Sequence, residues 1–413
     1  MNNIFYIISI ALSTIGSATI YAQPLDSLLV LTVENNPKLK ALSSAYQAKM
    51  AKVDQVSQLA DPTIGTGVPV LNPETRLGPQ IVMVSAQQMF PWFGTLNAKK
   101  DVVISMSKEQ YELIAAEKLE LFYQVKSAYY KIAFYQSKKE IIASQLKLFE
   151  AIENIALAKV ESGQTTIADA LRTQVVMETL SQEIKKIDNH IRSLETVINQ
   201  YTNQEWSNQI SVRDGIAQII PVDFDTAEFR SKIENHHPLI KKIDQQIETS
   251  NQELIVNKKA NSPKISLGVD YSLVNPRTDA SPVNNGRDIL IPKVMISLPI
   301  YRKSYKSKIE EEAIKQEMYA YQKEALTDKM MRQLLQYKID YDNALLNIQM
   351  HEKQIKITKI AIGILMTNYS STGNGFDEVL QQENALLVHE IGLIKSYLDM
   401  QLATANIERL TNF

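Results

Sequence analysis

Cysteine is absent from this sequence of 413 residues, so the chain forms no disulfide bond and offers no cysteine for an N-terminal lipid anchor. An excess of positive charge is also missing. The formal net charge is -2, which gives no reason to expect binding to nucleic acid. Beyond the N-terminal segment, no stretch reaches the roughly 20 apolar residues of a membrane-spanning helix. If the chain enters a membrane, we expect it to do so through β-strands.

The N-terminal segment has the pattern of a secretory signal peptide. An apolar stretch from Ile4 to about Ile15 is followed by small residues that suit cleavage after Ala22. The stretch is too short to span a bilayer, although an uncleaved N-terminal anchor is the alternative interpretation. We predict that residues 1–22 are a signal peptide and that the mature protein is exported.

Catalytic patterns are missing as well. The sequence has no nucleophile elbow, no Gly-rich phosphate loop and no HExxH pair. His236 and His237 are adjacent, so on a helix they would point apart, and their place at an expected helix start favours capping or solvation over metal binding. We predict a protein that is not an enzyme and uses no cofactor.

Proline is excluded from two long windows. All 14 prolines lie outside residues 92–220 and 300–413. Because proline in a helix interior costs about 3 kcal/mol, the windows predict very long helices over Leu96–Glu161 and Tyr305–Ser370. At the usual rise per residue, each helix would be roughly 100 Å long.

Both predicted helices carry an apolar seam with alternating steps of three and four residues. This spacing is typical of a coiled coil and calls for a partner helix. The seam residues are Leu121, Val125, Ala128, Ile132 and Tyr135 in the first helix, and Leu334, Tyr337, Tyr341, Ala344 and Ile348 in the second. A plain coiled-coil rod is the alternative, but strand-like segments between the helices argue against it.

Those segments alternate between apolar and polar or small residues, in two hairpins at about residues 63–89 and 264–298. The first strand is expected over Thr63–Val70. A half-buried sheet in a soluble protein shows the same alternation. Four strands cannot close a membrane barrel, whereas three chains would together contribute twelve strands around an aqueous lumen.

The chain also reads as a tandem duplication. Pro37 and Pro62 in the first half match Pro238 and Pro263 in the second at the same spacing, and Gly163 matches Gly373 further along. We predict two structural repeats, 23–220 and 221–413. Each repeat contains a helical segment of about 35 residues, a β-hairpin, a long helix and a returning helix.

Several motifs, in order, resemble the outer-membrane channel family typified by TolC. "VKSAYYKIAFYQSK" (125–138) resembles the first long helix of the family, and "QQMFPWFGTLNAKK" (87–100) resembles its strand-to-helix junction. "ESGQTTIADALRTQ" (161–174) and "GNGFDEVLQQENALL" (373–387) resemble its two helix-hairpin turns. The likeness covers essentially the whole mature chain.

The resemblance implies a mainly α fold with a small β part. Three chains would form a twelve-stranded β-barrel in the outer membrane, continuing into a long α-helical barrel in the periplasm. The implied partners are two further copies of the chain, a periplasmic adaptor, an inner-membrane RND-type or ABC-type pump, and outer-membrane lipid. No nucleic-acid partner is expected.

The resemblance also implies three groups of site residues. The barrel–tunnel junction would contain Phe90, Pro91, Trp92, Phe93, Gly94, Pro299 and Tyr301. The adaptor-contacting tips would contain Gly163, Gln164, Thr165, Gly373, Asn374 and Gly375. The periplasmic aperture would contain Glu378, Asp377, Asp169 and Gln381, with Gln381 standing where some members carry a second acid.

Alternatives remain for these sites and for the function. The junction aromatics could be buried core residues at a bend, and Asp169 and Asp377 could simply favour helix N-termini.

The predicted function is an outer-membrane exit duct of a tripartite efflux pump or type I secretion system, which conducts cargo passively. The alternative is a soluble periplasmic coiled-coil adaptor or scaffold, and the cargo stays open.

Overall fold

A computed structural model describes residues 25–71, 73–212, 215–216, 222, 224–372 and 375–411 of the chain. The predicted signal peptide lies outside the described residues and stays a prediction. The chain divides into two compact units. The first, called here the helical unit, combines residues up to Glu34 with Val125–Ile219 and Ala344–Asp399. The second, the mixed unit, combines Asn35–Gln124, Ile220–Asn343 and the C-terminal residues from Met400.

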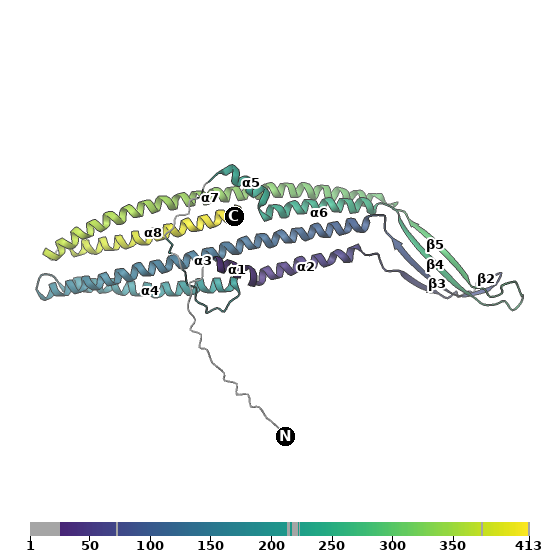
Figure 1. Ribbon diagram of the computed structural model, residues 1–413, viewed down its shortest axis with the longest axis horizontal. Helices are drawn as coiled ribbons and strands as arrows, with labels where there is room; N and C mark the ends of the chain where they lie inside the picture. The colour runs from purple at the N-terminus through teal and green to yellow at the C-terminus, as the bar shows by residue number, and fades with distance from the viewer. Residues whose placement is uncertain are drawn as a thin grey trace, which may run out of the picture. The chain divides into compact units, whose positions relative to one another are not determined.

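Two very long helices dominate the secondary structure (Figure 1). They are α3 (Thr95–Glu161) and α7 (Arg302–Thr372), which confirms the helices predicted from the proline-free windows. Their returning partners are α4 (Ile167–Thr202) and α8 (Phe376–Thr411). In both predicted seams the apolar residues are buried or half-buried, with Val125, Ile132 and Leu334 fully enclosed.

The shorter helices come in pairs, α1 (Leu25–Asn35) with α2 (Pro37–Ser57), and α5 (Thr226–His236) with α6 (Pro238–Ala260). Each predicted helical segment of about 35 residues therefore consists of two helices divided at a proline. A proline fits the first turn of a helix but cannot continue one, since its nitrogen has no hydrogen to donate.

Each break is closed by the residue before the proline. The Asn36 side chain accepts hydrogen bonds from the backbone N–H of Lys38 (2.9 Å) and Leu39 (3.3 Å). At the second break, His237 Nδ1 accepts from the N–H of Leu239 (3.2 Å), so His237 caps the helix, whereas His236 is exposed; the sequence had left capping or solvation open for this pair. Burial, and then the nearby positive charge of Arg409, lowers the pKa of His237 to about 4, so the cap is neutral and able to accept.

A five-stranded antiparallel sheet belongs to the mixed unit, with the order β1–β3–β4–β5. Its strands are β1 (Thr63–Gly67), β3 (Gly78–Phe90), β4 (Lys264–Val274) and β5 (Ile289–Ser297), with the two-residue β2 (Glu74–Thr75) paired to β3. The prediction that the first strand continues to Val70 was wrong. Pro69 has no N–H for the strand ladder, and β1 ends at Gly67.

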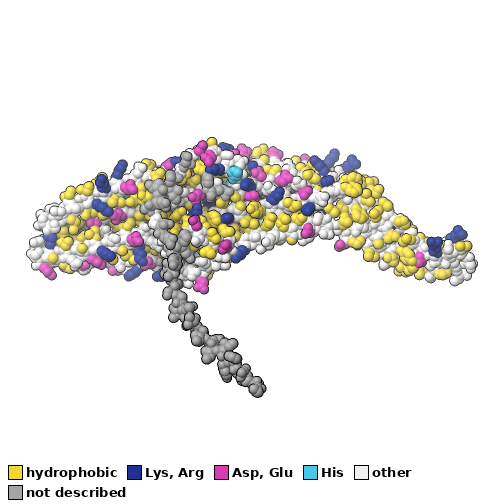
Figure 2. All heavy atoms as spheres, in the orientation of Figure 1, with side chains coloured by type: hydrophobic (Ala, Val, Ile, Leu, Met, Phe, Trp, Pro, Cys, Tyr) yellow, Lys and Arg dark blue, Asp and Glu magenta, His cyan; other side chains and the backbone are white. Residues whose placement is uncertain are grey.

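The two faces of β4 differ in burial. On β4, the polar residues Ser266, Asp270 and Ser272 are buried, while Leu267 on the other face is 49% exposed. Asp270 forms an ion pair with Lys293 of the adjacent β5. Exposed apolar side chains gather over the strands (Figure 2). A polar inner face behind an apolar outer face is the pattern of a strand that faces lipid.

Apolar clusters hold each unit together. In the helical unit, Phe149, Ile187 and Tyr369 are among the buried residues that join α3, α4, α7 and α8. In the mixed unit, Ile233 and Ile240 pack with Leu334 from α7. Each of these three residues is fully buried. Burial of apolar surface stabilises the folded state by about 25 cal/mol for each Å² removed from water.

Along the described parts of the chain, no helix is both long and apolar enough to cross a bilayer. The order of helices and strands is the same in residues 23–220 and 221–413, apart from the short β2. The tandem duplication itself stays a prediction.

Candidate functional site

The first predicted tip lies in the turn between α3 and α4. Gly163 has φ +72°, and a Cβ at this position would meet no other atom. Glycine is therefore favoured here only because it adopts a positive φ without strain. The N–H of Gln164 donates to the carbonyl of Lys159 at 2.9 Å and closes the end of α3. Gly163 and Gln164 are exposed, and Thr165 is half-buried.

A lysine that the sequence analysis did not single out joins this turn to the end of α7. Lys159 Nζ donates to Gln164 Oε1 at 3.0 Å and to the carbonyl of Ser370 at 3.1 Å. It also lies 5.5 Å from the centre of the Tyr369 ring. Burial raises the pKa of Tyr369, which lies in the apolar cluster of the helical unit.

The second predicted tip is described only in part, because Gly373 and Asn374 lie outside the described residues. Gly375 has φ +89°, and its carbonyl accepts from the N–H of Val379 at 3.2 Å at the start of α8. A Cβ at residue 375 would lie 3.1 Å from Glu378 Oε2. Any larger residue would therefore strain the backbone and crowd the Glu378 carboxylate.

Two of the predicted aperture acids meet at one arginine. Arg172 Nη1 on α4 lies 2.9 Å from Asp377 Oδ1 on α8 and 3.5 Å from Asp169 Oδ1. Asp169 is buried and also accepts from Thr165 Oγ1 at 2.7 Å. The sequence analysis missed Arg172, although its position three residues after Asp169 is the usual spacing of an ion pair on a helix.

The other two predicted aperture residues differ from this pair. Glu378 and Gln381 are exposed and lie one turn apart on α8, so they share a face of the helix. Neither forms an ion pair with a described residue. Of the three predicted carboxylates, Glu378 is therefore the one that forms no ion pair with a described residue.

A buried carboxyl group further along α8 was also missed. Gln145 Nε2 on α3 donates to Glu383 Oε2 at 2.9 Å, and Glu383 is 2% exposed. Burial raises the pKa of Glu383. No local sequence pattern links two residues so far apart in the chain, so only the packing of α3 against α8 reveals the pair.

The predicted junction lies where β3 ends and α3 begins. Gly94 has φ +74°, and the N–H of Thr95 donates to the carbonyl of Trp92 at 3.0 Å. Phe93 is 79% exposed and stands edge-on to the Trp92 ring, with ring centres 5.9 Å apart. The interpretation of buried core aromatics does not predict such exposure.

The remaining junction residues follow the same pattern. Phe90 and Pro91 are half-buried at the end of β3. After β5, Pro299 is half-buried and Tyr301 is 82% exposed just before α7. Exposed aromatic side chains thus flank both strand-to-helix connections in the mixed unit.

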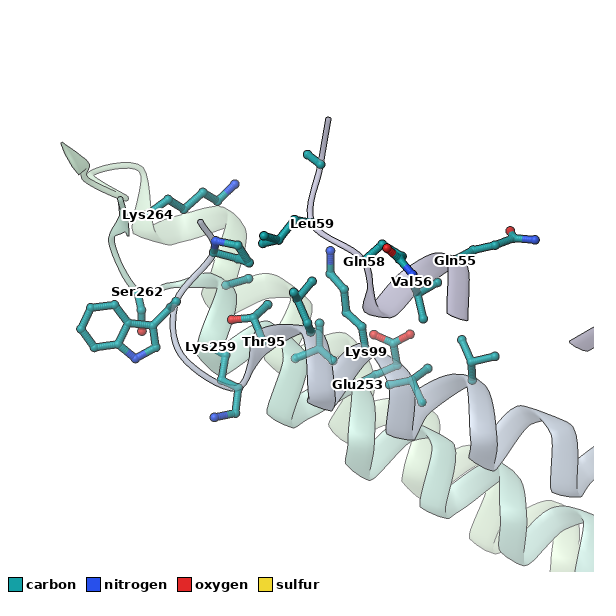
Figure 3. A pocket seen from close by; sticks show the side chains of 18 of the residues that line it. Gln55, Val56, Gln58, Leu59, Thr95, Lys99, Glu253, Lys259, Ser262 and Lys264 are labelled. Carbon is teal, nitrogen blue, oxygen red and sulfur yellow. The ribbon is translucent and has the colours of Figure 1, made fainter. Parts of the chain in front are cut away.

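A cavity of about 590 Å³ adjoins the first junction. It is bounded by the end of α2, the first turns of α3 and the end of α6, with Pro91 and Trp92 among its lining residues. Figure 3 shows Thr95, Lys99 and Glu253 in its middle, between Leu59 and Gln58 on one side and Ser262 on the other. Its volume is within the range usual for sites that bind small molecules.

No cofactor or metal site is evident in the described parts of the chain. No three His, Asp or Glu side chains are grouped there in a way that could hold a metal ion. His236 is exposed and His237 is committed to the cap of α6.

No protein-family model and no curated protein sequence matches the chain. Solved structures do match it. The outer-membrane channel OprN is 13% identical, with a TM-score of 0.75 over 94% of this chain and 89% of that chain. The outer membrane protein VceC of Vibrio cholerae is 13% identical, with a TM-score of 0.72 over 94% of this chain and 95% of that chain.

The MtrE outer membrane channel of Neisseria gonorrhoeae, in its open state, is 13% identical, with a TM-score of 0.73 over 94% of this chain and 88% of that chain. At such low identity, the likeness establishes the fold. It agrees with the long helices, the returning helices and the small antiparallel sheet described above. The chain therefore has the fold of TolC-type outer-membrane channels, mainly α with a small β part, as the resemblance predicted.

Proposed function

We propose that this protein is the outer-membrane exit duct of a tripartite efflux pump or a type I secretion system. Three copies would share one barrel, and cargo would pass passively from the periplasm to the exterior. The observation that carries the proposal is β4, whose polar residues Ser266, Asp270 and Ser272 are buried and whose apolar residues on the other face are exposed, on a fold shared with outer-membrane channels.

The sheet edges support the sharing of a barrel. Within the described residues, β1 pairs only with β3, and β5 pairs only with β4, so each edge strand leaves one side unpaired. An unpaired edge in lipid costs several kcal/mol for each unsatisfied backbone group. Pairing of β5 in one copy with β1 in the next removes both edges, and three copies give twelve main strands.

The surface of α7 supports the same assembly. Exposed apolar residues recur along the helix at steps of three, four, seven or fourteen residues, away from its buried seam. They are Ile314, Met318, Tyr321, Leu335, Ile339, Leu346, Met350, Ile357, Ile360 and Ile364. Exposed Ile167, Leu171 and Val175 on α4, spaced by four residues, offer a similar apolar surface on a second copy.

The site residues take roles within this proposal. Glu378, with Gln381 one turn further on, would line the periplasmic aperture, and threefold symmetry would make Glu378 a ring of carboxylates. Asp169 and Asp377 would instead tie α4 to α8 through Arg172. The two glycine turns would contact a periplasmic adaptor, which joins the duct to an RND-type or ABC-type pump.

The exposed aromatic residues at the junctions fit the level of lipid headgroups. Phe93 and Tyr301 are exposed aromatic residues at the two junctions, and aromatic residues are enriched where a membrane meets water. The proposed location is therefore the outer membrane, with a large periplasmic portion. A soluble adaptor is less well supported, since the matched folds cover nearly the whole chain.

The test is the mass of the protein extracted from outer membranes in detergent, measured by light scattering corrected for bound detergent. The expected mass is three times that of the mature chain. A monomeric mass, or recovery in the soluble periplasmic fraction, would reject the shared barrel and favour the soluble adaptor.

A further inference from the structure

The cavity beside Trp92 opens on the polar side of the sheet. Met89 and Lys264 are the strand residues in its lining. Met89 is directly opposite Ser266, which is buried on the polar face, so the two side chains share that face. Lys264 precedes Ser266 by two residues and therefore points the same way. In the proposed barrel, this side is the lumen.

Most of the cavity wall is apolar. Val56 from α2, Leu59 just after α2, Leu96, Val102 and Val103 from α3, and Val256 from α6 belong to it. This apolar wall extends over three helices of one unit, so it exists within a single chain. It suits the hydrocarbon body of a small molecule.

Positive charge surrounds the apolar wall. Lys52, Lys99, Lys259 and Lys264 line the cavity, against one carboxyl group, that of Glu253. Among these, Lys52, Lys99 and Lys264 form no ion pair with any described residue, whereas Lys259 donates to the carbonyl of Phe93 at 3.4 Å. In Figure 3, Lys99 extends between Leu59 and Gln58, and Lys259 points away. Burial, and then Glu312, raises the pKa of Glu253.

One polar group in the lining has no partner. Thr95 is 6% exposed, and its Oγ1 atom is buried without a hydrogen bond to any described residue. An unpaired buried hydroxyl costs about 1–3 kcal/mol, so a bound acceptor would relieve it. The lysines and the hydroxyl both favour a ligand that carries an anionic oxygen.

We propose that this cavity binds a soluble amphiphilic anion, with the apolar body against the wall and a carboxylate, sulfonate or phosphate near Lys99 and Lys264. Binding requires only the mixed unit. The further step, in which such anions are cargo that pauses in the lumen, rests on the proposed function. The polar side of the sheet favours a soluble ligand over a membrane lipid.

The probe pair for the test is 1-anilinonaphthalene-8-sulfonate and N-phenyl-1-naphthylamine, which share an apolar body and differ in the sulfonate. The reporter is Trp92, since Trp206 is the other tryptophan and can be removed by Trp206→Phe. We expect saturable quenching of Trp92 by the sulfonate probe. Lys99→Gln should weaken that binding about tenfold, because a charge-assisted hydrogen bond is lost. The neutral probe should bind more weakly and be unaffected by the substitution.

The control is Lys303→Gln, an exposed lysine of the same unit outside the cavity lining, which should change neither probe. Equal binding of both probes, or no effect of Lys99→Gln, would overturn the proposal. A phospholipid that co-purifies with the wild type but not with Lys99→Gln would assign the cavity to lipid and overturn the soluble ligand. Light scattering on the same sample measures whether the protein is a trimer. A failure of the binding proposal can therefore be told apart from a failure of the proposed trimer.

Discussion

At the scale of single residues, neighbouring acids on α8 have different surroundings. Asp377 is paired with Arg172, while Glu378 is exposed and unpaired among the described residues. The Arg172 and Asp377 side chains are 51% and 72% exposed, so their pair is worth at most about 1 kcal/mol. We therefore propose that Glu378 selects ions and that Asp377 provides only a weak restraint.

This assignment gives a prediction for the conductance of the protein in planar bilayers. Glu378→Gln should lower the preference for K⁺ over Cl⁻ at low salt about twofold or more, because a ring of carboxylates concentrates cations. Asp377→Asn removes the same charge one residue away and should leave selectivity nearly unchanged. An equal effect of both substitutions would contradict the distinction.

At the scale of elements, helix breaks depend on side chains that accept backbone hydrogen bonds. Asn36 and His237 occupy equivalent positions before a proline, and both cap the following helix. Asparagine has no charge to gain, whereas histidine loses its acceptor when Nδ1 is protonated. The second break therefore depends on pH, and the first does not.

The pKa of His237 is lowered in the folded protein, so the unfolded chain binds the proton more tightly. Stability from this residue is complete above pH 6.5 and is lost as the pH falls towards about 4, by at most about 3 kcal/mol. Between pH 7 and 5, amide hydrogen exchange in α5 and α6, corrected for intrinsic rates, should accelerate. His237→Asn should abolish that acceleration, and His236→Asn, at the exposed neighbour, should retain it.

At the scale of the whole molecule, assembly must cover the apolar stripe on α7. Leu346 is 62% exposed in the stripe, and Asn347 beside it is exposed on another face of the helix. In the proposed trimer, burial of a leucine contributes about 2 kcal/mol at each interface. Leu346→Lys should therefore lower the temperature at which trimers dissociate on native gels, and Asn347→Lys should not. A wild-type dissociation temperature in Leu346→Lys would exclude the stripe from the interface.

The sequence by itself determined the long helices, their seams and the strand segments, because proline exclusion and apolar spacing act locally along the chain. It also predicted turns near Gly163 and Gly373; Gly163 has φ above zero, and Gly373 lies outside the described residues. Tertiary structure decided the contacts between distant residues. The Arg172–Asp377 pair, the Gln145–Glu383 pair and the cavity at Thr95 join elements that no local pattern relates. Side-chain packing between helices sets which polar groups are buried and which remain free. This packing leaves Glu378 without an ion pair, unlike the acid beside it.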